Sequence, residues 1–126
     1  MDNYERLLNI IKQQAEIFLL DAREFFPFGT YINSKNEVVP LSAYIKDAND
    51  RPESQPLIDM LEQWIRTCIN NNDCVIGALA YDVVMTKNHE KFDVMVIRIY
   101  ENDKFLEHYF KYDIYEDHVT FLKVDA

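Results

Sequence analysis

The chain is poor in glycine and proline, with two and four of these residues among 126. Long flexible or proline-rich linkers are therefore excluded, and we expect a single domain over residues 1–126. A chain of this length buries roughly two-thirds of its unfolded surface, so it folds without a metal or a disulfide. No run approaches the ~20 apolar residues of a transmembrane helix, and the N-terminus does not have the pattern of a signal peptide. We expect a cytoplasmic protein with no membrane partner.

Cysteine is equally scarce, because Cys68 and Cys74 are the only two. Their spacing is not that of a zinc site, and two cysteines do not make a disulfide scaffold. Cys68 continues the apolar stripe of a helix, and Cys74 begins a strand-like run. We therefore expect two free, partly buried thiols in a reducing compartment.

Basic residues are few: 13 lysines and arginines stand against 22 acidic residues, which gives a net charge of −9. Such a field repels nucleic-acid phosphates and anionic membranes, so we expect no nucleic-acid partner. It favours solubility and a basic protein partner. A solvated acidic surface without a specific partner explains the same charge, and both interpretations stay open here.

Two segments have apolar residues at helical spacing. Residues 3–25 form the first, which Asp2 or Asn3 can cap and which Pro27 ends. The second begins near Pro56 and ends in the polar segment 70–73. Its stripe consists of Leu57, Leu61, Trp64, Ile65 and Cys68.

Six segments have the apolar pattern of strands. They are residues 28–33, 37–44, 74–86, 92–101, 104–114 and 119–124. The first two flank the turn formers "NSKN" and predict a hairpin, and short turns between the other four predict an antiparallel meander.

The predicted fold class is α+β: a helix–hairpin–helix unit followed by a four-strand antiparallel meander. The simplest packing places both helices on one face of the sheet and leaves the other face open. Pro40 lacks an N–H group, so its strand is expected at a sheet edge. Edge strands at Pro40 and at 119–124 allow a homodimer.

The open face is the candidate binding surface. A two-residue turn at Asn102–Asp103 places Glu101 opposite Lys104 and Arg98 opposite Glu107. Interfaces favour Tyr and Arg, although cross-strand ion pairs are also common on solvated sheets. The candidate partner-binding residues are Asp82, Arg98, Tyr100, Glu107, Tyr109 and Lys111.

Asp82 interrupts the apolar run "VIGALAYDVVMT", and two strand registers remain open for it. In the preferred register, the larger apolar set faces the helices and Asp82 shares the open face with Arg98. In the other register, Asp82 is buried and requires a partner or a raised pKa.

We find no pattern of catalytic, cofactor-binding or metal-binding residues, so we predict a protein that is not an enzyme. A nucleophile elbow, a glycine-rich phosphate loop and a His/Cys metal spacing are all missing. His108 is expected on the helix side, hydrogen-bonded to a neighbour. An enzyme would need Asp82, Glu107 and His108 in one cleft, yet Glu107 and His108 are consecutive in a strand and point to opposite faces.

The order "FFPFGTYI", "VVPLSAY", a Trp64-containing helix and "AYDVVMT" resembles a class of small bacterial proteins associated with immunity partners of toxin systems. This resemblance implies an acidic interaction protein that neutralises a basic toxin. The order of elements is also similar to profilin-like and roadblock-like domains, with a fourth strand in place of their terminal helix. That likeness implies a scaffold or a small-ligand sensor, with a pocket near Trp64, His108 and Tyr112.

Overall fold

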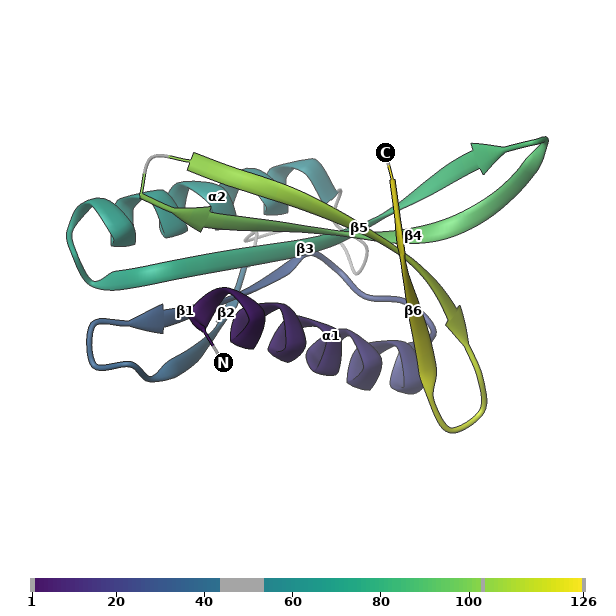
Figure 1. Ribbon diagram of the computed structural model, residues 1–126, viewed down its shortest axis with the longest axis horizontal. Helices are drawn as coiled ribbons and strands as arrows, with labels where there is room; N and C mark the ends of the chain where they lie inside the picture. Colours follow the sequence, from purple (N-terminus) through teal and green to yellow (C-terminus); the bar gives the residue numbers. More distant parts are fainter. Residues whose placement is uncertain (1, 44–53, 103, 126) are drawn as a thin grey trace.

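The computed structural model describes residues 2–43, 54–102 and 104–125, which form two helices and six strands. In chain order these are α1 (Asn3–Ala22), β1 (Phe28–Asn33), β2 (Val38–Ser42), α2 (Ser54–Asn70), β3 (Cys74–Lys87), β4 (Glu90–Glu101), β5 (Lys104–Ile114) and β6 (Val119–Val124). The strands build one antiparallel sheet in the order β2-β1-β3-β4-β5-β6 (Figure 1). No helix in these described ranges combines the length and apolar character needed to cross a membrane.

The predicted division into a hairpin and a four-strand meander is wrong. After α2, the chain returns beside β1, and β1 pairs with β3 from Phe28↔Ala80 to Asn33↔Cys74. Without this pairing, the N–H and C=O groups along β1 and β3 would form two exposed sheet edges in the middle of the protein. The protein is therefore α+β with a single six-stranded sheet, in which β2 and β6 are the edge strands, as expected.

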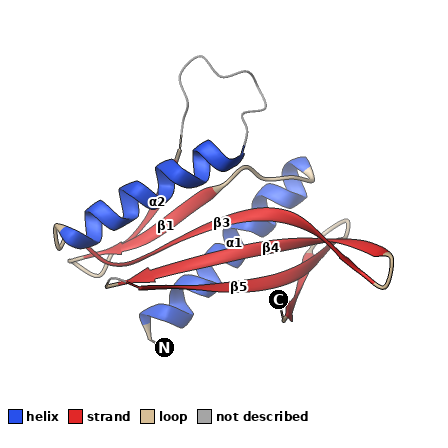
Figure 2. Cartoon of the chain, turned by 90° about the horizontal axis from the view of Figure 1, so that it is seen from above, coloured by secondary structure: helices blue, strands red, loops and turns tan. Residues whose placement is uncertain are grey.

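The helices pack on opposite faces of this sheet, which corrects the prediction that both share one face. The α1 helix buries Leu7 and Ile11 against a cluster that includes Ile76 and Ile97. The α2 helix buries its own apolar stripe against Leu79 on the other face. Figure 2 shows α1 crossing the strands diagonally, whereas α2 follows β1 and β3. These two sides are called the α1 face and the α2 face.

Strand β3 explains why both faces need a helix. Ile76 and Ala78 point to the α1 face and are fully buried, and Leu79 on the α2 face is fully buried as well. A strand that is apolar in both alternating sets must be covered on both sides. Gly77 has no side chain, and this lets α2 pack close to β3. A Cβ atom at this position would be 2.7 Å from Cγ2 of Ile65.

A disulfide between Cys68 and Cys74 joins the last turn of α2 to the start of β3, with the Cα atoms 5.2 Å apart. The prediction of two free thiols is therefore wrong. The chain reverses between the two cysteines, where Asn72 adopts φ 62° and the Asp73 N–H donates to the carbonyl of Cys68. This tight reversal brings together two side chains that spacing alone did not pair.

The α2 helix covers only part of its face. Its described contacts are mainly with β3 and β1, and fewer are with β4. On the same face, β6 presents Leu122, which lies opposite Lys111 of β5 and is 66% exposed. The region of the α2 face formed by β5 and β6 therefore has no packed helix among the described residues.

Candidate protein-binding surface

An ion-paired group lies where α2 meets the uncovered part of its face. Arg98 and Glu107 are opposite each other on β4 and β5, and their Nε and Oε2 atoms are 2.8 Å apart. The predicted cross-strand pair is confirmed. Arg98 also extends to α2, where its Nη1 atom lies 3.2 Å from Oε2 of Glu62. The single guanidinium thus joins the helix to two strands.

Three tyrosine hydroxyl groups complete the hydrogen bonding of the two carboxylates. Tyr81 and Tyr109 each donate to Glu107 at 3.2 Å, one to each oxygen. Tyr100 donates to Glu62. We call Glu62, Tyr81, Arg98, Tyr100, Glu107 and Tyr109 the Arg98 network. Because each carboxylate has several donors, these side chains are held in one arrangement.

The electrostatics of the Arg98 network keep its ion pairs charged. Burial by itself lowers the pKa of Arg98, but hydrogen bonds to Glu107 and Tyr100 outweigh it and the pKa rises. Burial likewise favours a higher pKa for Glu107, yet the hydrogen bond and charge of Arg98 bring it below its ordinary value. The Arg98 side chain is only 22% exposed, so solvent screens these pairs less than surface pairs.

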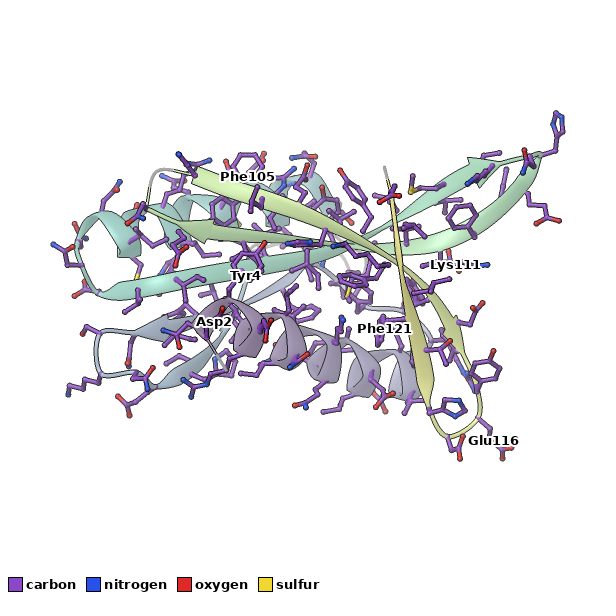
Figure 3. All side chains as sticks on the ribbon, in the orientation of Figure 1. Asp2, Tyr4, Phe105, Lys111, Glu116 and Phe121 are labelled. Carbon is purple, nitrogen blue, oxygen red and sulfur yellow. A yellow bond between two sulfur atoms is a disulfide. The ribbon has the colours of Figure 1, made fainter. Side chains whose placement is uncertain are left out.

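Aromatic and basic side chains flank the network on its solvent side. Phe105 of β5 is 41% exposed, and the guanidinium of Arg98 lies 5.5 Å from its ring centre. Arg66 of α2 lies over the same ring and 3.5 Å from Glu62. Further along β5 from Phe105 lies Lys111, and both residues are labelled in Figure 3. The Nζ atom of Lys111 lies over a different ring, 5.5 Å from the centre of Phe92.

Five of the six predicted binding residues therefore lie on the α2 face, and four of them belong to the Arg98 network. Sequence patterns did not predict that Glu62 and Tyr81 would belong to the Arg98 network. Glu62 and Arg66 are one helical turn apart, which signals an ion pair within α2 but not a contact with the sheet.

Asp82 is the exception, and its predicted register is wrong. It pairs with Met95, which points to the α1 face, so Asp82 and Arg98 lie on opposite sides of the sheet. Its pKa is raised by burial and then by the charges of Asp93 and Glu24. The choice between registers assumed that β3 has one covered face. Because both faces are covered, apolar alternation could not decide between them.

The arrangement does not assemble an acid–base site from the residues considered. Asp82 and His108 belong to the α1 face and Glu107 to the α2 face. His108 is hydrogen-bonded through Nε2 to the hydroxyl of Tyr4, and its pKa is lowered by burial and by Lys123 and Lys12. In the described part of the chain, no group of three or more His, Cys, Asp or Glu residues could hold a metal ion.

The prediction of a small-ligand pocket near Trp64, His108 and Tyr112 is also wrong. Trp64 belongs to α2 and packs on Tyr31, with ring centres 4.7 Å apart. His108 and Tyr112 lie on the α1 face, and Tyr112 packs near Phe25. The sheet separates these groups, so they line no common pocket.

Comparisons with protein-family models, with curated proteins and with solved structures found no match.

Proposed function

We propose that the protein is an interaction module that binds a basic protein partner, and that neutralising a basic toxin is its specific role. The observation that carries this proposal is the Arg98 network, which lies at the border of a sheet region that no helix of the described residues covers. Tyr109, Phe105 and Arg66 offer the residue types that protein interfaces favour. The proposed binding surface consists of these three residues with Lys111 and Leu122.

Preorganisation supports this surface as a binding site. The Tyr109 hydroxyl is held by Glu107, which is itself held by Arg98. Side chains that are already ordered lose less conformational entropy when a partner covers them. Exposed Leu122 supplies apolar area beside them, so that charged, aromatic and apolar contacts occur together.

The net charge of −9 supports a basic partner, because long-range attraction accelerates the encounter of oppositely charged proteins. The test is affinity capture from the native host, followed by titration of the purified partner at about 50 and 300 mM salt. We expect a basic protein whose association rate falls steeply as salt increases. A partner that is acidic, or that binds at the same rate at both salt concentrations, would contradict the proposal.

A small-ligand sensor is the second candidate function. A groove of about 470 Å³ beside α2 favours it, with Met60 and Trp64 among the residues that line it. This volume is within the range of ligand sites. Thermal unfolding in the presence of a metabolite set tests this candidate, since a ligand at one hundred times its Kd stabilises by about 2.7 kcal/mol. If no compound raises the Tm, the sensor is rejected.

The proposed homodimer uses the edge strands β2 and β6, and light scattering of the purified chain tests it. The cytoplasmic location stays a prediction from the N-terminal pattern. The reducing compartment was predicted from two free thiols, and the Cys68–Cys74 disulfide removes that part of the argument, because such bonds persist mainly in oxidising compartments.

A further inference from the structure

A pocket of about 300 Å³ lies where α1 ends, beside the start of β1 and the end of β2. Four phenylalanines and two acidic residues dominate its lining: Phe18, Phe25, Phe26, Phe28, Asp21 and Glu24. None of them belongs to the Arg98 network. The pocket is therefore a separate feature of the molecule.

The phenylalanines form a buried floor and an exposed rim. Phe18 and Phe25 each pack edge-to-face on Phe28, with ring centres 5.1 and 5.6 Å apart. Phe25 and Phe28 are buried, whereas Phe18 and Phe26 are 42% and 43% exposed. Two large aromatic side chains thus remain accessible at the mouth of a preformed aromatic pocket.

Two acidic residues give this aromatic pocket a negative charge. Asp21 and Glu24 line it, and the charge of Glu24 also reaches Asp82 on the neighbouring strand β3, where it raises the pKa after burial and Asp93. Arg23 is the basic residue between them in sequence, but it does not line the pocket. Its guanidinium donates instead to the carbonyl of Tyr115, at 3.2 Å.

We propose that this pocket receives the cationic end of a lysine or arginine side chain from a partner protein. The inference rests on the proposed function, because it names the chemistry by which a basic partner is held at a second place. Aromatic faces attract ammonium and guanidinium groups, and carboxylates at the rim add direct charge complementarity.

The pocket is large enough to hold one lysine or arginine side chain. About 300 Å³ is at the small end of the range for ligand sites, and the aliphatic stem of lysine or arginine can lie along the phenylalanine rings. A neutral apolar side chain fits the rings equally well. It offers nothing to Asp21, however, so the cation is the occupant that the whole lining favours.

The direct test is a titration of the full chain, in which amide NMR resonances report binding. The two compounds are Nα-acetyl-lysine methylamide, which keeps its side-chain ammonium group, and its neutral isostere Nα-acetyl-norleucine methylamide. We expect the lysine compound to shift resonances between Asp21 and Phe28 and to bind about 3- to 10-fold more tightly than the isostere. Equal binding of the two compounds, shifts elsewhere, or no binding would overturn the proposal.

Two variants separate the contribution of the acidic charge to binding from that of the phenylalanine rings. Asp21→Asn is expected to remove most of the preference for the lysine compound. Asp59→Asn makes the same change at an exposed position of α2 and is expected to leave this preference intact. Phe26→Ala is expected to weaken the binding of both compounds. An unchanged preference in Asp21→Asn, or unchanged binding in Phe26→Ala, would overturn the proposal. These titrations use no protein partner, so their failure leaves the proposed function to its own salt-dependence test.

Discussion

Ile65 of α2 lies directly over Gly77 of β3, so closely that a Cβ atom at position 77 would be 2.7 Å from Cγ2 of Ile65. This contact sets the height of the helix above the sheet. Glu62 precedes Ile65 by three residues on the same helix, and its carboxylate reaches Arg98 at 3.2 Å. The close approach at Gly77 therefore positions one half of the Arg98 network.

Gly77→Ala is predicted to destabilise the protein by about 1–3 kcal/mol, because the added methyl group forces α2 away from β3. Chemical denaturation measures the change. In an Ile65→Ala background the obstructing atom is gone, so the extra cost of Gly77→Ala should fall close to zero. Strictly additive effects of the two substitutions would contradict this packing.

Arg98→Ala is predicted to cost about 1–3 kcal/mol of unfolding free energy, because it leaves Glu62 and Glu107 without their shared cation in a half-buried place. Arg66→Ala is the matched control. Arg66 is more exposed and lies 3.5 Å from Glu62, so its loss should cost about 0–1 kcal/mol. Equal costs for the two arginines would show that Arg98 does not hold the network together.

The Arg98–Glu107 pair predicts a dependence of stability on pH. The pKa of Glu107 in the folded protein lies below its ordinary value of 4.5, because Arg98 outweighs the effect of burial. Its contribution is therefore complete above that ordinary value and is lost as the pH falls through the folded pKa. The stability difference between wild type and Glu107→Gln should shrink between about pH 5 and pH 3. A difference that does not change over this interval would argue against the ion pair.

Asp82 provides the opposite pKa shift. Burial, Asp93 and Glu24 raise its pKa above the ordinary value of 3.8, and NMR titration of the side-chain carboxyl measures this directly. Because the folded state disfavours the charged form, Asp82→Asn is expected to stabilise the protein at pH 7 and to lose this advantage below the raised pKa. A measured pKa at or below 3.8 would return Asp82 to a solvated position.

Reduction of the Cys68–Cys74 disulfide should lower the unfolding free energy by about 2 kcal/mol, the value expected for a loop of this short length. Denaturation with and without reducing agent measures the loss. The double variant Cys68→Ala/Cys74→Ala serves as the control and should show no effect of the reducing agent. A wild-type protein equally stable in both conditions would contradict a structural role for the disulfide.

Local patterns predicted the elements well. The antiparallel register Glu101↔Lys104 followed from the short turn after β4, and with it the Arg98–Glu107 pair. The start of α1 followed from a capping residue, since the Asp2 side chain accepts the Glu5 N–H. Each of these features depends on residues within a few positions of one another.

Apart from the Cys68–Cys74 disulfide, what sequence reasoning missed depends on long-range packing. The apolar residues of β3 fit either one covered face or two, and only the placement of α2 decides between them. The same placement brings Glu62 to Arg98 and moves Asp82 to the other side of the sheet. Nothing in the spacing of these residues encodes that choice, because it is made by contacts between segments far apart in the chain.

The most direct test of the proposed binding surface compares the affinity of the purified basic partner for Tyr109→Ala and Tyr115→Ala. Tyr109 belongs to the Arg98 network, whereas Tyr115 lies just after β5, outside the network and the proposed binding surface, and contacts His118. We predict that Tyr109→Ala weakens binding at least about tenfold and that Tyr115→Ala changes it by less than about twofold. Wild-type affinity in a folded Tyr109→Ala variant would contradict the account.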